Sequence, residues 1–296
     1  MHIDPVILRE YDIRGIIGEN LDADVARALG SAFGDRVRAA GGSSVAVGRD
    51  GRLSSPDIAA GMIAGLSEAG MTVFDVGMGP TPMLYFSTYE LGADAGVMVT
   101  GSHNPPNYNG LKMMLKGGPF FAGDIQTLGA SARDYVARPA SGPVEERPVF
   151  DRYIETLVGA FREGRPLSVV WDAGNGVAGP ATEALVAQIP GQHTCLFTEV
   201  DGTFPNHHPD PTVEKNLADL KQAVKEQGAD VGIGFDGDGD RIGVVDSAGR
   251  VLWGDQLMCV LATEVLAAIP GATVIADVKT SQVFFDEVAR LGGEPL

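Results

Sequence analysis

Apolar runs of strand length alternate with segments of helical period along almost the whole chain. Three of these runs are alike, because each is an apolar strand that ends at an aspartate and precedes a helix; they cover residues 44–50, 167–174 and 272–279. Such alternation predicts βαβ units and largely parallel sheets, and its recurrence indicates repeated modules. The predicted fold class is α/β: two tandem α/β modules with mixed, largely parallel sheets, plus the start of a third similar module.

The segment 137–148 interrupts this pattern with prolines, a Ser-Gly pair and no periodicity, as is typical of a linker. We therefore predict three domains, at 1–147, 148–250 and 251–296. The third would be incomplete, since the chain stops where its second strand should begin, and a single βα unit cannot cover both faces of a sheet.

Charge and composition exclude several classes of protein. The chain has 22 Lys+Arg against 39 Asp+Glu, a formal net charge of −17, which argues against a nucleic-acid partner. A local basic pocket for a phosphorylated small molecule remains compatible, because screening confines the surface field to ~8 Å at physiological salt. Cys195 and Cys259 form no CxxC pair, and no apolar run approaches the ~18–20 residues of a membrane helix. We expect a cytoplasmic protein without a membrane segment, and no protein partner is indicated.

The strongest local motif is Asp236-Gly-Asp238-Gly-Asp240-Arg241, directly after an apolar strand. Alternate residues of an extended segment project to one side, so the three carboxylates should converge. Like charges at this spacing repel unless a cation lies among them, and oxygen ligands favour Mg²⁺ or Ca²⁺. A solvated acidic turn is the simpler alternative.

A second motif, Thr100-Gly-Ser-His-Asn-Pro105, ends a predicted strand. A serine at such a corner can be exposed to solvent at the sheet edge where ligands bind. His103 would be an imperfect base for Ser102, since adjacent side chains usually diverge. The pair alone is a weak signal, and no G-x-S-x-G elbow accompanies it.

Two further features have structural readings as well as functional ones. The segment 174–179 matches GxGxxG between a strand and a helix, the context of a dinucleotide fingerprint, although glycine-rich turns are common elsewhere. His207 and His208 are adjacent in a proline-rich loop, where a structural role is more common than metal binding.

Together these segments resemble the α-D-phosphohexomutase superfamily, most closely its bacterial phosphomannomutase/phosphoglucomutase group. The resemblance covers essentially the whole chain, and its most specific part is the combination of TGSHNP with DGDGD. The matching segments, in order, are YDIRG (11–15), GRDGRLSSP (48–56), TGSHNPPNYNGLK (100–112), GNGVAG (174–179), FPNHHPDP (204–211) and FDGDGDR (235–241).

This resemblance implies roles for particular residues. Ser102 would carry a phosphoryl group, and one Mg²⁺ per chain would bind Asp236, Asp238 and Asp240, with a phosphoserine oxygen completing the site. The remaining expected site residues are Lys112 as base, Arg14 beside the transferred phosphoryl, His103 for positioning, and Tyr11, Arg241 and Lys279 for substrate binding. GRDGR would be scaffold and local phosphate environment.

The implied activity is interconversion of hexose 1-phosphate and hexose 6-phosphate, with mannose or glucose as the sugar. It would proceed through a phosphoserine and a hexose 1,6-bisphosphate, and glucose or mannose 1,6-bisphosphate would act as activator. Family members have four domains, so we expect this chain to be a truncated, inactive or weakly active fragment.

Four alternatives stay open at this point. A haloacid-dehalogenase-like phosphatase would use Asp236 as nucleophile and Asp238 as acid, but it leaves TGSHNP unexplained. A phosphoglucosamine mutase of the same superfamily is the second. A non-enzymatic scaffold would bind neither phosphate nor Mg²⁺, and a nicotinamide dehydrogenase would need cofactor binding at 174–179.

Overall fold

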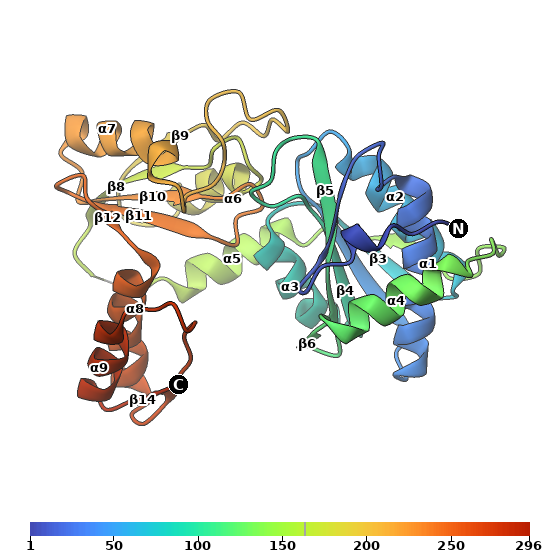
Figure 1. Ribbon diagram of the computed structural model, residues 1–296. Coiled ribbons are helices and arrows are strands. Elements are labelled where there is room, and N and C mark those ends of the chain that lie inside the picture. Colours follow the sequence, from blue (N-terminus) through green and yellow to red (C-terminus); the bar gives the residue numbers. More distant parts are fainter. Residues whose placement is uncertain (163) are drawn as a thin grey trace.

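The computed structural model describes residues 1–162 and 164–296, and its strands form three separate sheets (Figure 1). In Figure 1 the N-terminal part lies on the right, the second sheet on the left, and the red C-terminal part below the second sheet. This arrangement of strands and helices confirms an α/β fold with two modules and the start of a third. Within the described ranges, no helix combines the length and apolar character that a bilayer crossing requires.

The first sheet has the strand order β1-β5-β4-β2-β3-β7, with β6 paired to β5. Strands β4, β2, β3 and the edge strand β7 are parallel, whereas β5 runs antiparallel to β1, β4 and β6. The strands are β1 (Ile13–Ile16), β2 (Ser44–Arg49), β3 (Thr72–Met78), β4 (Ala95–Val99), β5 (Tyr108–Leu115), β6 (Gly118–Pro119) and β7 (Val144–Glu146).

Helices cover both faces of this sheet, so its central strands are apolar on both sides. Along β2, Val45 and Val47 belong to the larger core cluster and Ala46 to the smaller one on the opposite face, as the two-residue period of a strand requires. The larger cluster includes residues of α1 (Ala23–Ala39), α2 (Ser55–Glu68) and α4 (Gly123–Arg133), and the smaller one of α3 (Thr81–Glu90) and the start of α5 (Phe150–Ala160).

Helices α1 and α2 approach each other closely through small residues. A Cβ at Gly65 of α2 would lie 2.0 Å from the carbonyl oxygen of Arg27 on α1. Only glycine fits this crossing, because any side chain atom there would force the two helix backbones apart.

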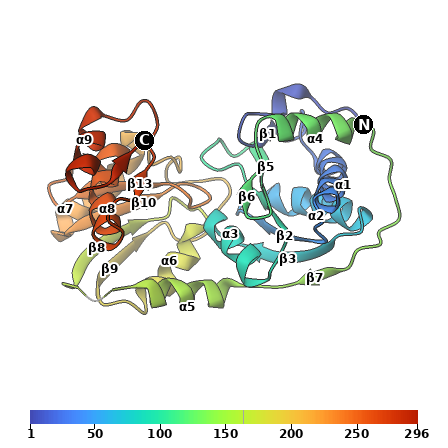
Figure 2. The same cartoon turned by 90° about the horizontal axis from the view of Figure 1, so that it is seen from below.

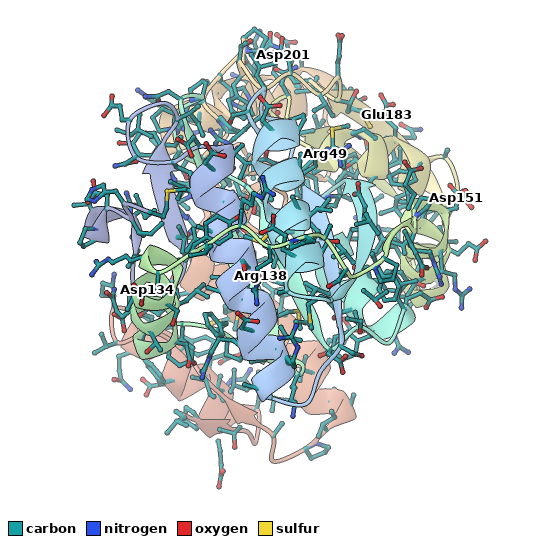
Figure 3. The ribbon with its side chains drawn as sticks, turned by 90° about the vertical axis from the view of Figure 1, so that its right-hand side faces the viewer. Arg49, Asp134, Arg138, Asp151, Glu183 and Asp201 are labelled. Carbon is teal, nitrogen blue, oxygen red and sulfur yellow. The ribbon has the colours of Figure 1, made fainter. Side chains whose placement is uncertain are left out.

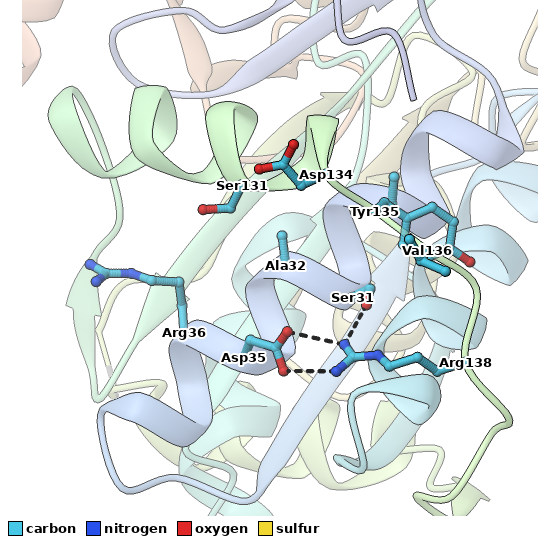
Figure 4. A pocket seen from close by; sticks show the side chains of 10 residues that line it. Ser31, Ala32, Asp35, Arg36, Ser131, Asp134, Tyr135, Val136 and Arg138 are labelled. Atoms are coloured by element: carbon cyan, nitrogen blue, oxygen red, sulfur yellow. Dashed lines mark hydrogen bonds and ion pairs between the residues drawn. The ribbon is translucent and has the colours of Figure 1, made fainter.

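The segment expected to be a free linker is instead partly a strand of the first sheet. Its residues Val144–Glu146 form β7 and pair in parallel with β3. The segment crosses the α1–α2 layer (Figures 2 and 3), where Arg138 donates hydrogen bonds to Asp35 (3.0 Å) and Ser31 (2.6 Å). Figure 4 shows Arg138 and Asp35 at the side of a cavity of about 440 Å³ between α1 and α4. The composition of this segment did not reveal the pairing of β7 with β3. The pairing holds the chain to the first sheet just before α5 begins.

The second sheet has the order β12-β11-β10-β8-β9, with β10, β8 and β9 parallel and the other pairs antiparallel. Helix α7 (Ala218–Gln227) covers one face through Leu220 and Val224, and α6 (Ala178–Val186) follows β8. β12 extends the sheet to Leu252, past the boundary expected after residue 250. The strands are β8 (Leu167–Asp172), β9 (Gly191–Leu196), β10 (Val231–Phe235), β11 (Ile242–Asp246) and β12 (Val251–Leu252).

The C-terminal part is a small unit with its own apolar cluster. Helices α8 (Gly254–Ala268) and α9 (Gln282–Arg290) pack through Leu266 and Phe284. β13 (Thr273–Val274) pairs in parallel with β14 (Glu294–Pro295). Short 3₁₀ helices lie at Pro5–Ile7 and Glu214–Leu217.

Candidate active site

Ser102 lies in the loop between β4 and β5, at the edge of the first sheet that faces the second. Its backbone is in the left-handed region, with φ of 49°, and its N–H donates to Thr100 Oγ1 at 2.8 Å. We expected an exposed hydroxyl, but Ser102 is fully buried. The reason is tertiary: the acidic loop of the second module covers it, so that a Cβ at Gly237 would lie 2.6 Å from the Ser102 carbonyl oxygen.

The acidic loop joins β10 to β11 and curls around one carboxylate. Asp236 Oδ1 accepts the backbone N–H groups of Asp240 (3.1 Å) and Arg241 (3.0 Å). Its other oxygen, Oδ2, accepts a hydrogen bond from Ser102 Oγ at 3.0 Å. The serine motif and the acidic motif, far apart in the sequence, therefore meet in one direct contact between the two modules.

Three carboxylates converge in this loop, as their alternate spacing predicted. Ligand oxygens of Asp236, Asp238 and Asp240 lie within 4.8 Å of one another, with the first two residues buried and the third exposed. Burial raises the pKa of Asp236 well above its usual range, and the charges of Asp238 and Asp240 raise it further. Burial would also raise the pKa of Asp238, but the adjacent ammonium of Lys112 outweighs it and lowers this pKa.

Two groups of the first module hold the acidic loop. Lys112 on β5 donates to Asp238 Oδ2 (2.6 Å) and Asp240 Oδ2 (2.5 Å). Thr81, the first residue of α3, donates its hydroxyl to Asp238 Oδ2 at 2.5 Å and its N–H to the Asp238 carbonyl at 2.8 Å. Burial lowers the pKa of Lys112, but the two carboxylates more than reverse this and raise it strongly. Lys112 is therefore an ammonium cation in this arrangement.

The acidic triad could hold a hard divalent cation. One carboxylate oxygen, Asp238 Oδ1, is buried without any hydrogen-bond partner, and such an atom carries a desolvation cost unless a ligand binds it. The donor set consists of carboxylate oxygens, which suit Mg²⁺ or Ca²⁺ rather than a softer metal.

A cavity of about 720 Å³ opens beside the triad and brings several expected residues together. It is lined by Tyr11, Arg14, Lys112, Asp240 and Arg241, and by aromatic residues of α3 and of the segment after β6. Arg14 forms an ion pair with Asp12. Three cations, Arg14, Lys112 and Arg241, line this cavity, and such groups favour an anion such as phosphate.

His103 joins this centre, whereas Lys279 does not. Contrary to the expectation of divergence, His103 Nδ1 lies 3.3 Å from Ser102 Oγ. Burial lowers the pKa of His103, and the charges of Arg241 and Arg14 lower it further. Lys279 is exposed in the loop after β13 and is not among the residues that line the cavity.

The glycine-rich turn at 174–179 is filled by protein. A Cβ at Gly176 would lie 2.8 Å from the Gly237 carbonyl oxygen, and one at Gly179 would lie 2.0 Å from that of Thr198. These close approaches support the acidic loop and the start of α6, and they give Gly176 and Gly179 a packing role. His207 has a structural contact, with Nε2 at 3.0 Å from Asp172 Oδ2.

Two residues of this centre were not singled out from the sequence. Thr81 precedes a proline at the start of α3, and nothing in the neighbouring sequence indicates that its hydroxyl would reach Asp238. Arg52 stood only within GRDGR, yet it is 1% exposed and contacts the Ser102 loop. The residues next to an arginine in the sequence do not indicate that its side chain will be buried.

Comparisons with known proteins agree on one group. Residues 5–134 match the family description "Phosphoglucomutase/phosphomannomutase, alpha/beta/alpha domain I", and residues 151–249 match domain II of the same description. The chain is 44% identical over 290 residues to a phosphomannomutase/phosphoglucomutase of Pseudomonas putida. It is 43% identical over 293 residues to a phosphoglucomutase of Neisseria gonorrhoeae.

These alignments cover 98% of this chain but only 63% and 64% of the two relatives. Among solved structures, a phosphoglucomutase/phosphomannomutase family protein of Burkholderia thailandensis superposes with a TM-score of 0.95 at 46% identity. That match covers 100% of this chain and 66% of the other. A putative phosphomannomutase of Thermus thermophilus, 24% identical with a TM-score of 0.89, shares the fold and covers 99% of this chain and 69% of its own length.

Proposed function

Because the chain belongs to the phosphoglucomutase/phosphomannomutase family, we propose that it carries the phosphoserine half of a hexose-phosphate mutase. The reaction would interconvert hexose 1-phosphate and hexose 6-phosphate, with glucose or mannose as the sugar. The observation that carries the proposal is the 3.0 Å hydrogen bond from Ser102 Oγ to Asp236, which joins an otherwise inert hydroxyl to a carboxylate cluster. The chain spans about 63% of the length of its Pseudomonas relative.

In the first step, the phosphoryl group on Ser102 moves to a hydroxyl of the bound hexose monophosphate. The bond from phosphorus to Ser102 Oγ breaks, a new bond forms to the sugar oxygen, and the proton of the sugar hydroxyl ends on Ser102 Oγ, the leaving oxygen. The resulting 1,6-bisphosphate turns over in the cavity and returns its other phosphoryl group to Ser102. A bisphosphate of glucose or mannose would therefore also phosphorylate an empty Ser102 and so act as activator.

The cations of the cavity would bind and orient the phosphates. Arg14 and Arg241 face the space beside Asp240, where guanidinium groups can hold phosphate oxygens by paired hydrogen bonds. Asp236, Asp238 and Asp240 would hold one Mg²⁺, with an oxygen of phosphorylated Ser102 completing the site. The ion would supply positive charge next to the transferred group.

The expected base, Lys112, is held as a donor in this arrangement. Its ammonium already donates to two carboxylates, so in this arrangement it neutralises charge and cannot accept a proton. His103, with Nδ1 at 3.3 Å from Ser102 Oγ, is the ring placed to exchange a proton with that oxygen. Lys112 could serve as base only after leaving the triad.

The phosphatase alternative is not favoured. A nucleophilic aspartate needs an oxygen open to the substrate phosphorus, whereas Asp236 is fully buried and its oxygens accept two backbone N–H groups and the Ser102 hydroxyl.

Phosphoryl transfer to Ser102 can be tested by intact-mass measurement and peptide mapping. Three proteins are incubated with Mg²⁺ and glucose 1,6-bisphosphate: the wild type, Ser102→Ala and the control Ser131→Ala. Ser131 is an exposed residue of α4. We expect one added phosphoryl group on Ser102 in the wild type and the control, none in Ser102→Ala, and loss of the reaction with chelator. A phosphoryl group on Asp236, or none on the wild type, would refute the proposal.

A further inference from the structure

Arg52 is a fully buried arginine that the transfer chemistry above does not use. It lies in the loop between β2 and α2 and is 1% exposed. Arginine is almost never buried to this degree unless its charge is paired. Its partners therefore indicate what the side chain is for.

Those partners are main-chain carbonyls of the serine loop. Arg52 NH2 donates to the carbonyl oxygens of Ser102 (2.7 Å) and Asn104 (2.6 Å), and NH1 donates to those of Pro105 (2.6 Å) and Tyr108 (3.0 Å). The loop thus wraps around one guanidinium group. Four carbonyls in such different directions need the planar fork of arginine, which the point charge of lysine cannot reproduce.

Asp50 completes the attachment from the other side. Its Oδ2 accepts the Gly101 N–H at 3.0 Å and lies 3.2 Å from Arg52 Nε. Gly101 packs directly against the guanidinium, since a Cβ there would lie 2.3 Å from Nε and 2.4 Å from Cζ. Both ends of the turn at Ser102 are therefore fixed to the Asp50–Arg52 pair.

The second module contributes one more contact. The Arg52 Cζ lies 5.2 Å from the centroid of the Phe204 ring, a distance at which a cation is attracted to an aromatic face. Phe204 follows β9 and belongs to the same module as Asp236. The group that holds the serine loop is thus itself covered by the module that supplies the acidic loop.

We propose that Arg52 is a positioning residue that holds the Ser102 loop in its left-handed turn, so that the hydroxyl faces Asp236. A left-handed backbone is unfavourable for serine, and the four carbonyl contacts are what keep the loop there. Arg52 is not among the residues that line the cavity beside the triad, and the acceptors described for its guanidinium are main-chain carbonyls rather than the Ser102 hydroxyl. Its consequence for phosphoryl transfer rests on the proposed function, whereas its effect on the loop does not.

The test combines loop dynamics with the rate of transfer in the full chain. Arg52→Lys keeps the positive charge but loses the planar guanidinium group. Gly101→Ala pushes that group out of position by steric contact, although residue 52 is still an arginine. Arg49→Lys is the control, because Arg49 on β2 pairs with Asp75 at 3.5 Å and contacts no part of the loop in the hydrogen bonds described. Circular dichroism and thermal unfolding establish folding, and hydrogen exchange of residues 100–110 reports the loop.

Faster exchange across residues 100–110 is expected in Arg52→Lys and Gly101→Ala, with the rest of the first module unchanged. Phosphorylation of Ser102 by glucose 1,6-bisphosphate should slow about 100-fold, the effect of a displacement of about 1 Å at a reacting group. Added guanidinium ion should restore part of the rate in Arg52→Gly, a rescue that a purely structural role would not give. The control should match the wild type in both measurements.

The outcomes separate the two proposals. Wild-type exchange and a wild-type rate in folded Arg52→Lys and Gly101→Ala would overturn the role of Arg52. No phosphorylation of the wild type, with faster loop exchange in the variants, would refute the proposed function and still support the positioning of the loop. If Arg52→Lys does not fold, Gly101→Ala decides alone.

Discussion

Substituting Gly237 by alanine should separate the two motifs of the active site by a known amount. The new Cβ would begin 2.6 Å from the Ser102 carbonyl oxygen, and ordinary contact begins at 3.4 Å. The acidic loop and the serine loop must therefore move apart by about 0.8 Å, because the obstructing atom is backbone and cannot rotate away. The direct contact between Ser102 Oγ and Asp236, 3.0 Å long, would lengthen beyond hydrogen-bond distance.

A displacement of this size at a reacting group costs about 100-fold in rate. The assay is phosphorylation of Ser102 by glucose 1,6-bisphosphate with Mg²⁺, followed over time by intact mass. Gly159→Ala is the matched control, since a Cβ at this position on α5 meets nothing within 4 Å. A folded Gly237→Ala chain that phosphorylates at the wild-type rate would refute the reasoning that this contact sets the transfer geometry.

Three further predictions concern the metal site, a pH-dependent pair and the helix crossing. Asp238→Asn should weaken Mg²⁺ binding at least about tenfold, because it removes a charged ligand; calorimetry with unchanged affinity would contradict this. Burial lowers the pKa of His207, but the hydrogen bond and charge of Asp172 reverse this and raise it. Stability from this pair is therefore fully present below about pH 6.5 and is lost as pH rises through the folded-state pKa. Asp172→Asn should then lower the Tm more at about pH 5 than at about pH 9, and an equal loss at both would speak against it. Gly65→Ala should reduce the free energy of unfolding by about 3 kcal/mol, because its Cβ would meet the Arg27 carbonyl at 2.0 Å; urea denaturation near the wild-type midpoint would rule this out.

Local pattern was sufficient for most of the elements and for the metal loop. The strands at 44–50 and 167–174 follow from their apolar runs alone, and β2 and β8 lie there. Asp236, Asp238 and Asp240 converge because alternate residues after a strand point the same way, a property that the neighbours of the loop do not alter. The period of a short segment fixes its shape over a few residues, which is why these predictions held.

Local sequence patterns did not predict the contacts between segments that are far apart in the chain. Composition indicated a linker at 137–148. Part of this segment is a strand, because it pairs with the outer edge of β3 in the folded sheet. Ser102 was expected to be exposed because its loop alone gives no sign of the second module that covers it. The contacts of Arg52 with the Ser102 loop and of Thr81 with Asp238 span at least 50 residues of the chain, so the neighbouring sequence gives no signal for them.

The sequence by itself therefore determined the α/β class, the two motifs that carry chemistry and the type of ion that the acidic one suits. The tertiary structure alone decided that Ser102 Oγ would meet Asp236, that Lys112 would bridge Asp238 and Asp240, and that Lys279 would lie elsewhere. The physical reason is one of range. Strand period and ligand chemistry are properties of a few consecutive residues, whereas the placement of a hydroxyl against a carboxylate depends on how two separately folded sheets pack.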